Sequence, residues 1–199
     1  MPDAPLPPQR DRTPSPWKSL RENALTLIIA LLVALLIRAY VAEPRFIPSD
    51  SMVPTLLKDD RLVVEKVSYY FRPPQFGEIV VFRPPASPYL KDYGSDQVFI
   101  KRVIGLPGQR LRIQDGSVYI NDQPLREPYI AEPPRYDCDR QPCFIRPGET
   151  ITVPEDDFFV MGDNRNNSND SHVWGFLPRR NIVGRAWIRF FPLNRLGGL

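Results

Sequence analysis

The hydrophobic positions of this chain follow two different patterns. Residues 24–37 read ALTLIIALLVALLI, which is 14 consecutive positions without a charge and without a polar face. After residue 43, short runs rich in β-branched and aromatic residues alternate with segments rich in proline, glycine and aspartate. The first pattern is typical of an apolar helix and the second of short strands joined by turns. We therefore expect one helix followed by a β-rich domain.

The apolar run is long enough to cross a bilayer. Extended past Arg38 it has 19 residues, which span ~28 Å as a helix if the Arg38 side chain reaches the interface. A buried helix of a soluble domain would show a polar face. A cleavable signal peptide would need small residues before its cut, where Tyr40 and Val41 stand. We expect an uncleaved anchor over residues 21–42, preceded by a proline-rich disordered tail over residues 1–20.

The β-rich domain is expected over residues 43–199. Asp115-Gly116 between two predicted strands is a strong signal for a two-residue hairpin. Residues 83–96 and 122–149, rich in proline, aspartate and tyrosine, are predicted as loops. The fold class is therefore all-β with one N-terminal transmembrane helix. The predicted strands are residues 62–67, 78–82, 98–104, 111–114, 117–120, 150–153, 158–161 and 182–191.

Composition and charge exclude several kinds of chemistry. The chain has 199 residues, of which 26 are basic and 23 acidic, and it has no long basic run, so we expect no nucleic-acid partner. The small positive excess is compatible with an anionic membrane surface. With one histidine, His172, and two cysteines, the chain lacks the donors for a His-rich metal site or a four-ligand Cys/His zinc cluster. We expect neither a metal nor another cofactor.

The two cysteines bear on the compartment. Cys138 and Cys143 are close enough in sequence to close a small disulfide loop in an oxidising compartment, and two free thiols are the alternative. Basic residues are nearly balanced on the two sides of the anchor, so the positive-inside rule decides little. The orientation that suits the cysteine pair places a short tail inside and the large domain outside.

A nucleophile and a base are suggested by two separate stretches. Ser49 and Ser51 lie in PSDSMVPT, residues 48–55, where prolines restrict the backbone that directs the hydroxyls. Lys101 lies in a predicted strand with apolar residues on both faces. Burial lowers the pKa of a lysine by up to ~3–5 units, which would leave a neutral amine able to take a proton from Ser51. An ordinary turn and a lysine at a sheet edge are the simpler alternatives.

A third stretch is strongly polar. Residues 162–171 are too dense in asparagine, aspartate and serine to form a strand. A cluster of turns is one interpretation. A network of side chains that holds a neutral amine in place is the other.

Together these stretches resemble the bacterial type I signal peptidases, the membrane-bound serine endopeptidases that remove signal peptides from exported proteins. The matching blocks occur in the order of the family and run from about residue 43 to 188. Four blocks in order are far more specific than any one of them. They are residues 49–55, 77–82, 100–108, and, within 162–176, residues 162–165, 168, 170, 171 and 174–176.

The resemblance implies a role for each matching residue. Ser51 would be the nucleophile and Lys101 the general base. The oxyanion hole would use the Ser51 backbone amide and the Ser49 hydroxyl, and Ser168 would hydrogen-bond Lys101 and orient it. Three charged residues would brace the site: Asp163, Arg165 and Asp170. The residues that match the two small substrate pockets are Ile47, Pro48, Met52, Leu56, Phe99 and Ile100.

The resemblance also implies a fold, substrates and a location. The family fold is a coiled, mostly antiparallel β-sheet domain on a membrane anchor, and the substrates carry small residues at the first and third positions before the cut. The expected partners are secretory preproteins and the lipid bilayer, and the chain is expected to be a monomer. The expected location is the bacterial inner membrane, with a single span and the catalytic domain on the periplasmic face. A thylakoid membrane is the alternative.

The chain departs from the family pattern at four positions. Asp50 stands where glycine is common between the serines, Arg45 where an apolar pocket residue is frequent, Asn166 where aspartate is frequent, and His172 where arginine often follows the aspartate. None of these changes removes a catalytic group, and we expect the Asp50 carboxylate to point away from the site. The alternative function is a membrane-tethered β domain that binds partner proteins without catalysis.

Overall fold

Two compact units make up the chain, Met1–Ala39 and Tyr40–Leu199. The computed structural model describes residues 16–91, 93–94 and 97–199. The first 15 residues of the predicted tail lie outside these described residues. Helix α1 (Pro16–Tyr40) begins within the remainder of that tail. It starts at a proline because the fixed backbone angle and missing N–H of proline suit the first turn of a helix.

Helix α1 is long and apolar enough to cross a membrane. The stretch Asn23–Tyr40 contains 18 residues, and none of it is buried against the rest of the described chain. Apolar side chains exposed all round a helix need a nonpolar solvent or a partner. This is the helix that the sequence predicts as the anchor.

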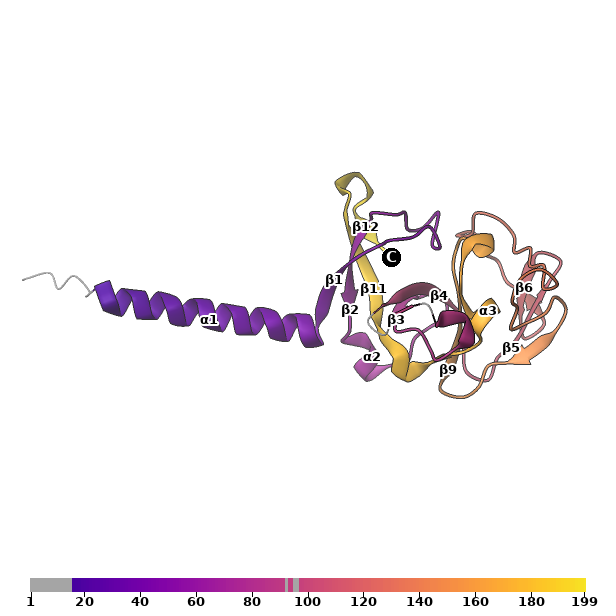
Figure 1. Cartoon of the computed structure of the whole chain (residues 1–199), viewed down its shortest axis with the longest axis horizontal. Helices are drawn as coiled ribbons and strands as arrows, with labels where there is room; N and C mark the ends of the chain where they lie inside the picture. Colours follow the sequence, from indigo (N-terminus) through magenta and orange to yellow (C-terminus); the bar gives the residue numbers. More distant parts are fainter. Residues whose placement is uncertain (1–15, 92, 95–96) are drawn as a thin grey trace, which may run out of the picture. The chain divides into compact units, whose positions relative to one another are not determined.

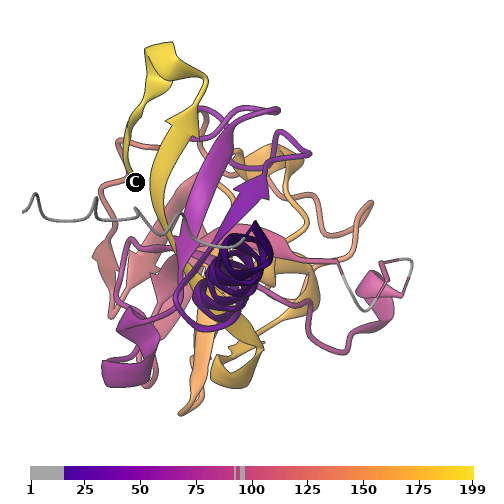
Figure 2. The same ribbon diagram turned by 90° about the vertical axis from the view of Figure 1, so that its left-hand side faces the viewer.

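The second unit is built around an antiparallel sheet of eight strands. Seven are hydrogen-bonded in the order β1-β2-β11-β3-β4-β9-β10, and β12 pairs with β11 (Figure 1). In Figure 2 the purple strands β1 and β2 lie side by side with the yellow strand β11. Register shifts interrupt the pairs of β11 with β2 and β3 and of β4 with β9, and such bulges bend a sheet. The curled antiparallel sheet confirms the predicted fold class. The bounds are β1 Ala42–Phe46, β2 Arg61–Glu65, β3 Ile79–Phe82, β4 Phe99–Gly105, β9 Asp157–Met161, β10 Leu177–Pro178, β11 Ile182–Phe191 and β12 Gly197–Gly198.

A second, smaller antiparallel sheet has four strands in the order β7-β6-β5-β8. The turn between β5 and β6 contains Asp115 and Gly116, with φ values of 50° and 73°. A two-residue type I′ turn requires positive φ at both positions, so the predicted hairpin is confirmed. The bounds are β5 Arg110–Gln114, β6 Ser117–Ile120, β7 Gln123–Pro124 and β8 Thr150–Thr152.

Short helices lie in the connections between strands. Helix α3 begins after Asp170, whose carboxylate accepts a hydrogen bond from the His172 amide at 3.1 Å and so caps the helix. The polar stretch 162–171 therefore contains turns and the start of a helix, and no strand. The bounds are α2 Ser68–Phe71 and α3 Ser171–Trp174, with 3-10 turns η1 Pro88–Leu90, η2 Arg165–Asn167, η3 Arg179–Asn181 and η4 Leu193–Arg195.

The hydrophobic core lies on both faces of the central strands. In β3, Ile79 and Val81 pack into one cluster, whereas Val80 and Phe82 pack into another. The neighbouring strand β4 is buried from Ile100 onward. A strand that is covered on both faces removes water from any polar side chain that it carries.

Every strand predicted from the hydrophobic pattern is present, with its ends shifted by two residues at most. Four further strands are not predicted. Strand β1 reads AEPRF and lacks an apolar run, and β7, β10 and β12 contain only two residues each. Pairing with a neighbouring strand, which local pattern does not reveal, makes these segments extended.

The disulfide loop lies against helix α3. Cys138 and Cys143 form a disulfide with their Cα atoms 5.4 Å apart. The next residue, Phe144, donates its backbone N–H to the His172 carbonyl at 2.6 Å, and its ring meets Phe176 edge-on with centroids 5.2 Å apart. The loop thus joins the smaller sheet to the helix that follows the polar stretch.

The disulfide yields a prediction. We expect no cysteine of the folded, unreduced protein to react with a thiol label, and reduction to lower the free energy of unfolding by about 2 kcal/mol, because the closed loop is short. Label incorporation and chemical unfolding with and without reductant would measure both. A double variant, Cys138→Ser with Cys143→Ser, should be insensitive to reductant. Two labelled thiols in the unreduced protein would contradict the prediction.

Candidate active site

The centre of the candidate site is the pair formed by Ser51 and Lys101. Lys101 comes from β4, and Ser51 comes from the loop between β1 and β2. Lys101 Nζ lies 2.9 Å from Ser51 Oγ and 2.9 Å from the Ile100 carbonyl oxygen. Both side chains are buried, with Ser51 7% and Lys101 4% exposed. An amine and a hydroxyl fifty residues apart in sequence are therefore at hydrogen-bonding distance, and both are buried.

Burial changes the protonation of Lys101. Removal from water lowers the pKa of its ammonium from 10.5 to about 8, although the negative charges of Asp170 and Asp163 act in the opposite direction. A substantial fraction of this amine is therefore neutral at mildly alkaline pH. A neutral amine can accept a proton from a hydroxyl that it contacts.

Donors for a developing negative charge lie beside Ser51. Ser49 Oγ is 3.4 Å from Ser51 Oγ. The Ser51 carbonyl accepts a hydrogen bond from the Asn164 amide at 3.1 Å, whereas the Ser51 amide donates to no acceptor within the described residues. An unpaired backbone N–H next to a nucleophile is a group that an oxyanion hole requires.

The serine loop, residues 47–60, is closed at its base. Ile47 N–H donates to the Asp60 carbonyl and Asp59 N–H donates to the Ile47 carbonyl, both at 2.9 Å. Within the loop, Leu56 N–H donates to the Met52 carbonyl, also at 2.9 Å. These bonds restrict the loop backbone and therefore the directions of the two hydroxyls.

Asp163 braces the serine loop from one side. Its two carboxylate oxygens accept hydrogen bonds from Arg102 Nε and Nη2 at 2.8 and 2.6 Å, and Thr55 Oγ1 donates to Oδ2 at 2.5 Å. Asp163 is predicted from the sequence, but Arg102 and Thr55 are not. Arg102 follows Lys101 directly in β4. Because successive side chains of a strand point to opposite faces, the sequence would place Arg102 on the face opposite to Lys101.

The two other predicted charged residues also have buried partners. Arg165 donates from Nε to the Gly162 carbonyl at 3.0 Å and pairs through both terminal nitrogens with Glu127 of the predicted 122–149 loop. Asp170 accepts the Gly162 amide at 2.8 Å and contacts His172 Nδ1 at 2.7 Å. Burial alone would raise the pKa of Asp170, but the His172 ring, the Ser168 hydroxyl and the Gly162 amide lower it below the ordinary value. His172, which departs from the family pattern, therefore contacts the aspartate through its ring.

Ser168 lies at the site, but its predicted bond to Lys101 is absent. Ser168 lines the same cleft as Lys101. Its Oγ makes no well-formed hydrogen bond among the described residues, but it lies close enough to the Asp170 carboxylate to lower the pKa of that group. A Cβ on Gly162 would collide with Ser168 Oγ and with the Ser51 carbonyl oxygen. Gly162 therefore allows the polar stretch to approach the nucleophile. This close approach was not predicted.

A cleft of about 570 Å³ opens at Ser51 and Lys101. Of the six predicted substrate-contact residues, Pro48, Phe99 and Ile100 line it. The prediction is corrected for the other three, because Ile47, Met52 and Leu56 are 2% exposed or less and pack in the core cluster behind the loop. The remaining lining residues are Ser49, Asp50, Lys58, Tyr93, Gln97, Val98, Asn167, Ser168 and Asn169.

The three other departures from the family pattern have different surroundings. Asp50 is exposed and lines the cleft, so its expected orientation away from the site is not supported. Arg45 pairs with Glu43. Asn166 accepts the Arg135 amide at 2.8 Å and donates to the Pro133 carbonyl at 3.1 Å, which ties the 122–149 loop to the polar stretch.

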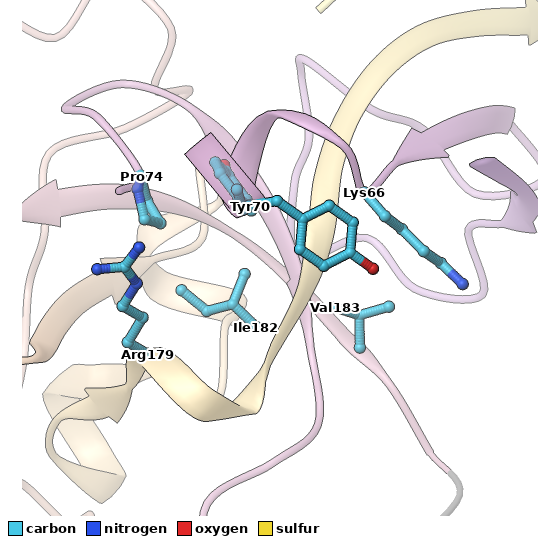
Figure 3. Close-up of a pocket in the computed structure, with 7 residues that line it drawn as sticks. Lys66, Tyr70, Pro74, Arg179, Ile182 and Val183 are labelled. Atoms are coloured by element: carbon cyan, nitrogen blue, oxygen red, sulfur yellow. The ribbon is translucent and has the colours of Figure 1, made fainter. Parts of the chain in front are cut away.

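A second pocket is separate from the cleft. Figure 3 shows Lys66 and Arg179 at its two ends, with Ile182 and Val183 between them. It shares no lining residue with the cleft and contains none of the predicted site residues. Within the described part of the chain, no group of three or more histidine, cysteine, aspartate or glutamate side chains is placed to hold a metal ion.

Comparisons with known proteins agree with this geometry. The model of the family described as signal peptidase, peptidase S26, matches residues 20–191. The probable signal peptidase I-1 of Synechocystis sp. is 56% identical over 191 residues, which are 96% of this chain and 92% of that protein. The signal peptidase I of Leptolyngbya laminosa is 50% identical over 180 residues, covering 90% of this chain and 84% of that protein. The thylakoidal processing peptidase 1 of Arabidopsis thaliana is 43% identical over 178 residues, covering 88% of this chain and 49% of that protein. The chain therefore belongs to the signal peptidase family, peptidase S26.

Proposed function

We propose that this chain is a membrane-bound serine endopeptidase that cleaves N-terminal signal peptides from exported preproteins. Ser51 is the nucleophile and Lys101 the general base. The observation that carries the proposal is the 2.9 Å contact between Lys101 Nζ and Ser51 Oγ, in a buried site that opens onto a cleft. The family match supports the class of reaction.

The reaction proceeds through an acyl-enzyme. Neutral Lys101 takes the proton of Ser51 as Oγ attacks the carbonyl carbon of the scissile bond. The resulting ammonium gives that proton to the leaving amine, which is the new N-terminus of the mature protein. A water molecule then attacks the ester, again with Lys101 as base, and frees Ser51 and the carboxylate of the signal peptide.

Ser49 and the Ser51 amide stabilise the tetrahedral intermediate. The unpaired Ser51 N–H and the Ser49 hydroxyl, 3.4 Å from Ser51 Oγ, are the two nearby donors for the oxyanion. Ser168 completes the site from the polar stretch. Arg165 and Asp170 hold the backbone of this stretch at Gly162, and Asp163 holds the serine loop through the Thr55 hydroxyl.

The family match supports a preference for small residues at the first and third positions before the cut, and the cleft offers a place for this part of the substrate. Residues 48–51 and 97–101 both line the cleft, so an extended substrate can lie between them and bond their main chains. Met52 and Leu56 fill the space behind the serine loop and are fully buried. This dense packing behind the serine loop leaves room for a methyl group of the substrate more easily than for a long substrate side chain.

The N-terminal helix supports a membrane location. Helix α1 supplies one candidate span, and the relatives include cyanobacterial and thylakoidal proteins. We place the β-rich unit on the outer, oxidising face of a bacterial membrane of plasma or thylakoid type, because this suits the Cys138–Cys143 disulfide. The enzyme acts as a single-span monomer on preproteins presented at the bilayer surface.

The test is cleavage of a model preprotein by the purified full-length chain in detergent. We expect one cut, located by mass spectrometry, after the small residue that ends the signal peptide. A preprotein with phenylalanine at that position should be cut at least about 100-fold more slowly, because a close-packed pocket rejects the added volume. A preprotein with an alanine-to-serine change there is the matched control and should be cut well. Equal cleavage of all three would contradict the assigned specificity, and no cleavage of any would favour a non-catalytic binding domain.

A further inference from the structure

The segment after the last long strand returns to the serine loop. Turn η4 and strand β12 follow residue 191, where the family match ends. Strand β12 pairs with β11, and the Leu199 amide donates to the Trp187 carbonyl at 3.0 Å. In Figure 1 this yellow hairpin lies beside the purple loop that follows β1. The segment is therefore ordered against the rest of the unit and is close to the residues that carry the nucleophile.

Arg195 joins this segment to the serine loop by hydrogen bonds. Its Nη1 donates to both carboxylate oxygens of Asp60, at 2.8 and 2.9 Å, and its Nη2 donates to the Thr55 carbonyl at 3.2 Å. Arg189 of β11 donates to the same Thr55 carbonyl at 2.8 Å and to the Arg195 carbonyl at 2.6 Å. Asp60 is 1% exposed, so its carboxylate has lost its contacts with water. Its hydrogen-bond partners must compensate for that loss.

These hydrogen bonds involve Asp60 and Thr55, two residues that restrain the conformation of the serine loop. The carboxylate of Asp60 also accepts the Leu57 amide at 2.9 Å, and its carbonyl accepts the Ile47 amide at the base of the loop. Thr55 is held from two sides: its hydroxyl bonds Asp163, and its carbonyl bonds the two arginines. Ser49 and Ser51 lie between Ile47 and Thr55 in the chain, so both ends of the segment that carries them are restrained.

We propose that Arg195 is a positioning residue for the peptidase reaction, acting through Asp60 and Thr55 to keep Ser51 at bonding distance from Lys101. This inference rests on the proposed function. Arg195 touches neither Ser51 nor Lys101. Its role is to hold the loop through the Asp60 carboxylate and the Thr55 carbonyl, whereas Asp163 and Arg102 bond the Thr55 hydroxyl. A misplacement of about 1 Å at a reacting atom can cost ~10²-fold in rate, so a restraint of this kind has a measurable effect.

The experiment compares Arg195→Met with the wild-type full-length chain on a model preprotein. Methionine keeps much of the length and apolar volume of arginine but removes all five donors. We expect kcat to fall about tenfold or more while KM changes less than about threefold, because the restraint acts on the nucleophile and the cleft lining stays in place. Arg195→Lys, which keeps one charge but cannot bond Asp60 and Thr55 as a fork, should recover part of the loss. Arg180→Met, at an exposed arginine of η3, is the matched control and should keep wild-type kcat.

Two further measurements separate positioning from general instability. The pH at which the rate levels off should be the same in Arg195→Met and the wild type, because the pKa of Lys101 depends on its burial and on Asp170 and Asp163, which the variant leaves in place. Hydrogen exchange of peptides that cover residues 47–60 should be faster in the variant, and exchange of β3 and β4 should be unaltered. Wild-type kcat in Arg195→Met would overturn the inference, as would a loss of activity that only follows the unfolded fraction. If the wild-type chain does not cleave the preprotein, or if Ser51→Ala does, the proposed function fails instead.

Discussion

Replacing Ser51 with alanine is expected to reduce kcat for preprotein cleavage by about 10⁴-fold or more, because no acyl-enzyme can form without Oγ. Ser51 Oγ contacts only Lys101 Nζ and Ser49 Oγ among the described residues, so its removal should leave the fold intact. Cleavage rates and thermal unfolding of the purified variant would measure the two effects separately.

A graded comparison makes this prediction sharper. Ser49→Ala removes one donor of the proposed oxyanion hole and should cost ~10²–10³-fold in kcat, which is less than the loss of the nucleophile. Near wild-type turnover by Ser51→Ala would reject the Ser51 nucleophile. If the cellular function survived in Ser51→Ala without any cleavage, a partner-binding domain would be the better interpretation.

Replacing Lys101 with methionine is expected to abolish cleavage at every pH. The wild-type rate, in contrast, should rise with pH. The pKa of Lys101 is lowered to about 8 by burial, and only the neutral amine acts as a base. We therefore expect kcat/KM of the wild type to rise about tenfold per pH unit below pH 8 and to level off above it. A wild-type profile that is flat from mildly acidic to alkaline pH would contradict a lysine base.

The same residue predicts a difference in stability. The pKa of the lysine is 10.5 when it is solvated and about 8 in the folded protein. Between these two values the unfolded chain binds more protons than the folded chain, so the free energy of unfolding should rise with pH across this window. Because other groups titrate too, the quantity to measure is the difference between wild type and Lys101→Met in chemical unfolding. We expect the methionine variant to gain stability relative to wild type as pH falls from 10.5 to 8, and a pH-independent difference would contradict the burial of a titrating amine.

Strand positions were predictable because they depend on local pattern. Alternation and β-branched runs located β2 to β6, β8, β9 and β11, and Asp115-Gly116 located a hairpin. A long apolar run likewise located helix α1. The strands that pattern missed are β1 and the two-residue segments, whose extended form comes from their partners.

The site was predictable in its residue types and only partly in its contacts. Ser51 and Lys101 could be singled out because histidine is scarce and Lys101 lies in an apolar strand. The family resemblance implies that Met52 and Leu56 belong to the substrate pockets, but a motif match does not tell which side of a loop faces the core. The predicted hydrogen bond between Ser168 and Lys101 is absent. A contact between two distant segments depends on how both are folded, which motifs do not tell.

The sequence by itself determined the apolar anchor helix, the positions of the main strands along the chain, the family and the two groups suited to proton transfer. These follow from composition, periodicity and motifs within short stretches. Only the tertiary structure decided that Lys101 is 4% exposed and 2.9 Å from Ser51, and that Arg102 and Arg195 hold the serine loop from two sides. The physical reason is that burial and ion pairing are set by segments far apart in the chain. Asp60 and Arg195, 135 residues apart, meet only because β11 pairs with β2.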